Sequence, residues 1–164
     1  MISVRAARPE EFERTGRLVY DAYDAEGHVA ADPDPQFGAG LQDAAWRAEH
    51  GEVLVAVDAS GELLGTVTVV LPGSPLAEIS RPGEVEVRML ATSPVARGRG
   101  VGTALVEAVL ARARGLGAAR VVLCTLPGMT AAHGLYERLG FRRAGDLDWE
   151  PVTDYPLIGF CRDL

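Results

Sequence analysis

A glycine-rich turn in the second half of the chain has the residue types that bind phosphate. The stretch Arg97–Gly102 (RGRGVG) follows an apolar run, residues 85–91, and precedes a segment of helical periodicity, residues 103–114. Glycine has no Cβ, so its backbone can turn tightly and come close to a ligand. The first N–H groups of a helix have no internal partner and lie at the positive end of the helix dipole. The turn therefore predicts a site for the diphosphate of a large cofactor.

Two common phosphate motifs do not fit this turn. A P-loop needs a lysine followed by Ser or Thr, and all 16 basic residues of this chain are arginines. The dinucleotide fingerprint is Gly-x-Gly-x-x-Gly with an acidic residue about 20 positions on. Here the spacing is Gly98-x-Gly100-x-Gly102, and residues 118–123 contain no acid.

A third class of motif does fit. Arg97-x-x-Gly100-x-Gly102 resembles the Arg/Gln-x-x-Gly-x-Gly/Ala signature of the GNAT superfamily of N-acetyltransferases, which in that family binds the pyrophosphate of acetyl-CoA. Residues 87–94 (VRMLATSP) look like the strand that approaches this signature, and residues 134–141 (GLYERLGF) resemble the family's second signature. One helix and one strand separate the two, as in the family. The resemblance implies a single GNAT domain over residues 1–164.

The resemblance also implies where acetyl-CoA binds. The candidate contacts are Met89, Leu90, Ala91, Arg97, Gly98, Arg99, Gly100, Val101, Gly102 and Thr103. Backbone N–H groups of residues 89–91 would polarise the thioester carbonyl if the strand splays there, and one such donor contributes roughly 10²–10³ in rate. The family often has an asparagine about seven residues before its tyrosine, where it binds the pantetheine arm. Met129 stands here, so that contact is missing or is made by Thr130 or by backbone groups.

Two side chains are candidates for proton transfer. By resemblance, the hydroxyl of Tyr136 would face the CoA sulfur and act as the general acid. Glu86 lies on the strand that leads to the active site and is the candidate general base, since partial burial can raise the pKa of a carboxyl toward the working range. Glu84 and a chain of water molecules remain alternatives for the base.

Composition limits the partners. The net charge of −7 and pI of about 5.0 argue against nucleic acid and favour a cationic or amine-bearing acceptor. No apolar run is long enough to span a bilayer and the N-terminus lacks the apolar core of a secretory signal, so we expect no membrane partner and a cytoplasmic location. The two cysteines and three histidines show no metal or disulfide spacing, so we expect acetyl-CoA as co-substrate and no metal.

The acceptor is less well determined. By resemblance, its specificity lies in the first helices, their connecting loop and the C-terminal strands. Acidic and aromatic residues are frequent there, which suits a cationic amine, but solvation of an acidic surface explains them equally well. A small-molecule amine and a protein amine both stay open, as does a homodimer. The resemblance implies an enzyme that moves the acetyl group of acetyl-CoA to a primary amine. The alternative function is a non-catalytic acyl-CoA-binding module on the same fold.

The elements that must position these residues follow from the hydrophobic pattern. We expect helices over residues 9–27, 41–50, 103–114 and 130–139, and a long loop or two short helices over residues 29–40. We expect strands over residues 2–7, 52–58, 63–71, 84–92, 120–126, 141–149 and 157–161. This order mixes a hairpin-connected half with a βαβ half. It predicts a mixed α/β fold with a mostly antiparallel central sheet of about seven strands, flanked by helices.

Overall fold

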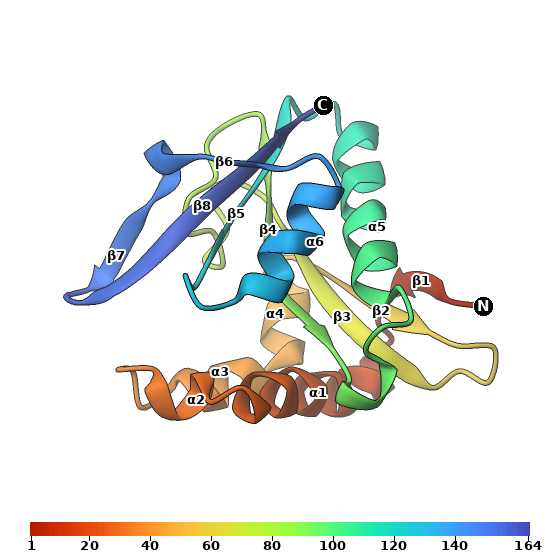
Figure 1. Ribbon diagram of the computed structural model, residues 1–164. Coiled ribbons are helices and arrows are strands. Elements are labelled where there is room, and N and C mark those ends of the chain that lie inside the picture. Colours follow the sequence, from red (N-terminus) through yellow and green to blue (C-terminus); the bar gives the residue numbers. More distant parts are fainter.

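The computed structural model describes residues 1–164, and its strands form one sheet (Figure 1). Along the sheet the order is β1-β2-β3-β4-β5-β8-β6, and β7 pairs with β8. The strand bounds are β1 Ser3–Ala6, β2 Glu52–Val57, β3 Leu63–Val70, β4 Glu84–Thr92, β5 Arg120–Thr125, β6 Arg142–Arg143, β7 Trp149–Val152 and β8 Tyr155–Asp163.

Every strand pairing is antiparallel except that of β4 with β5. The predicted fold class, a mostly antiparallel sheet flanked by helices, is therefore confirmed, with eight strands rather than about seven. The parallel pair is short, joining residues 84–86 to residues 120–122. A parallel pair needs a crossover, and here α5 (Val101–Gly115) makes it.

Helices cover both faces of the sheet because successive strand residues point to opposite sides. On β2, Leu54 and Ala56 pack with the apolar side of α5 in the main core. Val55 and Val57 belong to a separate cluster with Leu18 of α1 (Phe12–Ala25). In Figure 1, α1 to α3 lie along the bottom and α4 lies behind the strands, while α6 (Thr130–Arg138) lies in front of β4 and α5 runs along the right side.

The segment between α1 and β2 contains three short helices. These are α2 (His28–Ala31), α3 (Phe37–Gln42) and α4 (Ala44–His50). The expected single helix over residues 41–50 was wrong at its start, because Asp43 interrupts it. The Asp43 carboxylate accepts a hydrogen bond from the backbone N–H of Trp46 at 3.1 Å, which caps a new helix at that point.

The expected strand over residues 141–149 was also wrong. A single turn of 3₁₀ helix, Gly145–Leu147, separates β6 from β7. The Asp148 carboxylate accepts from both terminal nitrogens of Arg143 at 2.6 Å and from the backbone N–H of Gly159 at 2.8 Å. These bonds hold the chain in a bend that the alternating sequence pattern does not reveal.

No helix of this fold combines the length and the apolar character that crossing a membrane would require.

Candidate active site

The predicted phosphate turn has a backbone that only glycines adopt easily. Gly98 and Gly100 have φ of 78° and 81°, in the left-handed region, and open space surrounds both. Gly100 is the N-cap of α5, and the first helical hydrogen bond runs from Ala104 N–H to Gly100 O at 3.0 Å. The N–H groups of residues 101–103 therefore have no partner inside the helix, which is the geometry that an anion site needs.

The two arginines of the turn are both exposed. Arg97 Nη2 lies 3.1 Å from Glu26 Oε1, just past the end of α1, so one guanidinium already bridges the turn to α1. About half of each of these side chains remains in solvent, which makes this ion pair weak. The phosphate contacts predicted for Arg97 and Arg99 stay predictions.

The strand β4 is interrupted where the oxyanion donors were expected. Its register with β3 shifts between Thr66 and Thr68, so Met89 and Leu90 together oppose one residue of β3. Met89 has a φ of 56°, which is rare for a residue with a side chain. This β-bulge leaves one residue of β4 unpaired and turns the strand. A break of this kind in the strand is the condition under which the N–H groups of residues 89–91 were expected to polarise the thioester carbonyl. The splay itself is thus present, and the catalytic contact stays a prediction.

Tyr136 lies on α6 and is almost fully buried, with 5% of its surface exposed. Its ring packs at 5.7 Å from that of Phe141 and at 6.0 Å from that of Phe160, between centroids. Burial raises the pKa of its hydroxyl well above the ordinary value, so the phenol stays protonated through the neutral range. The phenol can therefore donate a hydrogen bond, while its raised pKa makes it a weaker acid than an exposed tyrosine.

The structure gives the two strand glutamates other partners. Glu86 is 0% exposed, and its carboxylate accepts hydrogen bonds from the backbone N–H groups of Glu78, Ile79 and Ser80. Glu84 bonds the guanidinium of Arg120 and accepts from the backbone N–H of Arg81. Every oxygen of these two carboxylates already accepts a hydrogen bond, so this geometry does not favour the base role of Glu86, which stays a prediction.

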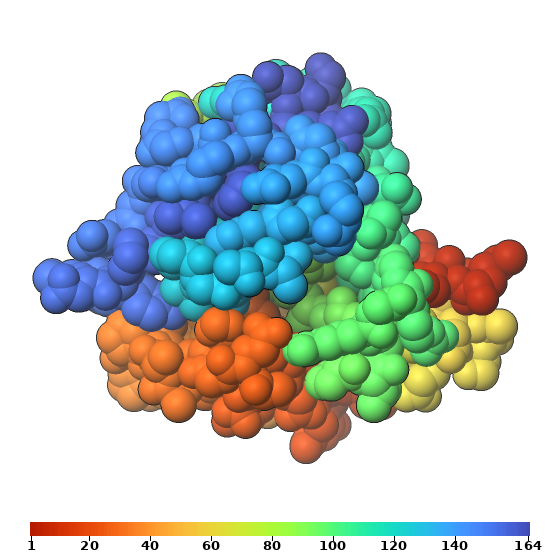
Figure 2. Space-filling model, in the orientation of Figure 1, coloured from red at the N-terminus to blue at the C-terminus, as the bar shows by residue number.

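The turn, the bulge and Tyr136 come together on one face of the sheet. The N-terminus of α5, through Val101 and Leu105, belongs to the same core cluster as Tyr136, and Leu90 packs against that cluster. Figure 2 shows a hollow on this face, bordered by the green segment around the turn, the blue segment of α6 and the orange end of α1. The three elements thus border one hollow in the surface.

Two positions that bear on the geometry of the site were not found from the sequence. Gly65 of β3 lets α5 approach, because a Cβ there would lie 2.7 Å from Val101 Cγ1 and 2.8 Å from Ala91 O. Glu78, in the proline- and glycine-rich loop before β4, lies beside Arg88 and Cys124. The available signal was the loop itself, since long loops often carry function.

Other residues considered from the sequence have structural contacts. Thr125 Oγ1 lies 3.3 Å from Met129 Sδ, and His133 Nε2 lies 3.0 Å from Leu126 O. Burial is the main cause that raises the pKa of the Cys124 thiol to about 12, which leaves it protonated and unreactive. No three His, Cys, Asp or Glu side chains are grouped to hold a metal ion.

Comparison with known proteins agrees with this arrangement. A sequence profile of the Acetyltransferase (GNAT) family matches residues 15–141, which include the turn, the bulge and Tyr136. The chain belongs to the GNAT acetyltransferase family. The match begins in α1 and ends just after α6.

Relatives and solved structures extend the comparison. Mycothiol acetyltransferase of Salinispora tropica is 44% identical over 108 residues, which are 63% of this chain and 31% of that protein. Human N-acetyltransferase 8B is 31% identical over 71% of this chain and 51% of its own length. The chain thus spans less than a third of the mycothiol acetyltransferase that it matches. A GNAT-family acetyltransferase from Staphylococcus aureus superposes with a TM-score of 0.76 at 17% identity over 100% of this chain and 99% of its own.

A Corynebacterium glutamicum structure described as histone acetyltransferase HPA2 and related acetyltransferase gives a TM-score of 0.74 at 26% identity. It covers 99% of this chain and 96% of its own. These structures share the whole sheet with this chain, so the fold assignment does not depend on the two signatures alone.

Proposed function

We propose that this chain is an N-acetyltransferase that moves the acetyl group of acetyl-CoA directly to a primary amine of a small molecule. The observation that carries the proposal is the bulge at Met89 and Leu90. The bulge lies on β4, and two other elements pack in the same core. One is the start of α5, with the free N–H groups of the turn, and the other is the helix that carries Tyr136. Anion binding, carbonyl polarisation and proton donation are the parts that acyl transfer from a CoA thioester needs.

The residues of the turn fit a diphosphate. The N–H groups of residues 101–103 would hold its oxygens, and the open space at Gly98 and Gly100 lets the backbone approach it. Arg97 and Arg99 would add charge at the solvent side. When bound, acetyl-CoA supplies the thioester carbonyl that the amine attacks.

Tyr136 would act on the leaving group. As the carbon–sulfur bond breaks, the thiolate needs a proton, and the buried phenol donates a hydrogen bond and then the proton to it. The apolar wall of Phe141 and Phe160 keeps water from that proton. The bulge N–H groups would stabilise the negative charge on the carbonyl oxygen during the same step.

The acceptor is proposed from chemistry and relatives together. Two of the relatives are a mycothiol acetyltransferase and an N-acetylaspartate synthetase, and both names refer to small molecules. The aligned part of the chain covers only 31% and 26% of these two proteins, so the acceptor does not transfer with the name. A suitable first panel is therefore L-aspartate, glucosamine, spermidine and a short peptide with a free N-terminus.

Thiol release from acetyl-CoA across this panel tests the proposal, with CoA binding measured separately by calorimetry. We expect turnover on at least one amine. We expect Tyr136→Phe to lower kcat by about 10²-fold while the dissociation constant of CoA stays within twofold. Binding of CoA without turnover on any amine would instead support a non-catalytic acyl-CoA module, and an unchanged kcat in the variant would remove Tyr136 from the mechanism.

A further inference from the structure

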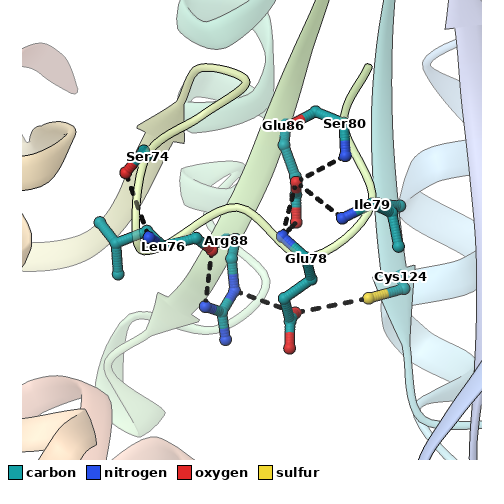
Figure 3. A network of polar contacts seen from close by, with 8 residues as sticks. All are labelled: Ser74, Leu76, Glu78, Ile79, Ser80, Glu86, Arg88 and Cys124. Atoms are coloured by element: carbon teal, nitrogen blue, oxygen red, sulfur yellow. Dashed lines mark hydrogen bonds and ion pairs between the residues drawn. The ribbon is translucent and has the colours of Figure 1, made fainter.

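The fully buried carboxylate of Glu86 organises the loop that precedes β4. Its Oε1 accepts from the backbone N–H groups of Glu78 at 3.1 Å, Ile79 at 3.2 Å and Ser80 at 3.0 Å, and its Oε2 accepts from Glu78 N–H at 3.1 Å. Three consecutive N–H groups thus point at one carboxylate (Figure 3). Because these bonds fix the backbone of residues 78–80, they also fix the place from which the Glu78 side chain extends.

That side chain is held by one of its two oxygens. Glu78 Oε1 lies 3.1 Å from Arg88 Nε and 3.6 Å from Cys124 Sγ. Arg88 Nη1 also donates to Leu76 O at 3.0 Å, which ties the same loop to β4 a second time. Oε2 takes part in none of these contacts, and the side chain keeps 24% of its surface exposed. Figure 3 shows the carboxylate extending past the loop, between β4 and β5.

The position of Glu78 relative to the sheet matches the reaction. Val87 and Leu123 point into the core that holds Tyr136, so their neighbours Arg88 and Cys124 point to the opposite face. The pairing of β4 with β5 ends at residues 86 and 122, two positions before these side chains. Glu78 therefore lies on the other side of the sheet from Tyr136, at the point where the two parallel strands stop pairing.

Four titratable groups act on Glu78. Arg88 and Glu86 face it from β4, Cys124 faces it from β5, and Tyr23 faces it from α1. Burial raises the pKa of the Glu78 carboxyl above its ordinary value; Arg88 opposes this shift and Glu86 adds to it. A carboxylate with a raised pKa is a better proton acceptor near neutral pH than an exposed one.

We propose that Glu78 is a catalytic residue that binds the acceptor's ammonium group and takes up its proton, and that Glu86 is a positioning residue that holds the loop carrying it. The inference rests on the proposed acetyl transfer. Oε2 of Glu78 accepts one proton from the ammonium, which frees the nitrogen lone pair to form a bond to the thioester carbon. The carbon–sulfur bond then breaks, Tyr136 gives its proton to the sulfur, and the second proton leaving the nitrogen restores the phenol. The proton on Glu78 passes to solvent, so one proton is released per amide formed.

Three variants of the whole chain test this assignment. They are Glu78→Gln, Glu86→Gln and the control Glu107→Gln, which removes an exposed carboxylate on α5. The assay records kcat/KM against pH with acetyl-CoA and whichever panel amine the wild type turns over fastest. CoA affinity and thermal unfolding are measured alongside.

We expect Glu78→Gln to lower kcat about 10²-fold and to remove the acidic limb of the pH profile that belongs to the carboxylate, with CoA affinity unchanged. The melting temperature should fall slightly, because the ion pair with Arg88 is lost. Glu86→Gln should lower both kcat and the melting temperature but keep that limb, because Glu78 is still present. The control should match the wild type throughout.

Two results would overturn the assignment while leaving acetyl transfer intact. One is a Glu78→Gln profile equal to that of the wild type. The other is loss of the acidic limb in Glu86→Gln but not in Glu78→Gln, which would make Glu86 the base. If the wild type binds CoA and acetylates no amine of the panel, acetyl transfer itself fails, and the role of Glu78 fails with it.

Discussion

Replacing Gly65 with alanine should disturb the acetyl-CoA site from beneath, without changing the identity of any residue that is predicted to contact the cofactor. A Cβ at this position would lie 2.7 Å from Val101 Cγ1, 2.8 Å from Ala91 O and 3.1 Å from Leu105 Cδ1. The Val101 methyl can rotate, but the Ala91 oxygen belongs to the backbone of β4 and moves only with the strand. Since Ala91 and Val101 border the bulge and the turn, relief of the clash must move one of them.

Overpacking of this kind costs about 1–3 kcal/mol of unfolding free energy. For a chain of 164 residues that corresponds to roughly 2–4 °C of melting temperature per kcal/mol. The measurement is urea unfolding followed by circular dichroism, together with calorimetric titration of CoA. We expect a lower midpoint at unchanged slope and weaker CoA binding.

Gly115 provides the matched control. It is the last residue of α5, and a Cβ there would meet no atom within 4 Å. Gly115→Ala should leave CoA binding unchanged and stability equal or up to about 1 kcal/mol higher. If Gly65→Ala unfolded at the wild-type urea midpoint and bound CoA normally, the close approach of α5 to β3 would not be a constraint on the site.

Three further changes probe separate features. Gly100→Val places a β-branched residue at a φ of 81°, so it should strain the turn and raise KM for acetyl-CoA at least tenfold, as initial rates would show. Glu11→Gln should lower stability at pH 7 by about 1–2 kcal/mol, because Arg5 donates to that carboxylate at 2.7 and 3.0 Å. The hydrogen bond from Arg5 lowers the pKa of Glu11, so its stabilisation is full above the unfolded value and is lost as pH falls through the folded one; acid titration of the variant should show a shallower loss. Cys124 should react more slowly with iodoacetamide at pH 8 in the folded protein than after denaturation, because the side chain is half-buried and burial is the main cause that raises its pKa to about 12. Equal labelling rates before and after denaturation would contradict this.

The sequence predicted the strand, the turn and the helices that carry the proposed donor side of the site. Local patterns carried that information: a glycine turn before a helix is a short-range feature, and so is the spacing of Tyr136 from Phe141. The helix boundaries followed from hydrophobic periodicity, with α5 at Val101–Gly115 where residues 103–114 were expected. The absence of lysine excluded the P-loop without any knowledge of the fold.

The C-terminal region shows where local patterns fail. Residues 141–149 alternate as a strand does, but the bend at Asp148 depends on Arg143 and on Gly159, which belongs to another strand. A hydrogen bond between segments 11 residues apart leaves no periodic mark in either of them. The capping of α4 by Asp43 was in principle readable, since an Asp before an apolar helical pattern is a known start signal.

The sequence by itself determined that the chain has a glycine-rich turn before a helix, a tyrosine on the next helix and a mixed sheet to hold them, because each depends on residue types at fixed short spacing. Only the tertiary structure decided which carboxylate keeps an oxygen without a hydrogen-bond partner. Glu86 is 0% exposed and engaged by three N–H groups, whereas Glu78 keeps one oxygen free, and both facts result from a loop that folds back onto β4. Burial and hydrogen-bond satisfaction depend on contacts between segments, so a carboxylate's role cannot be assigned from its place along the chain.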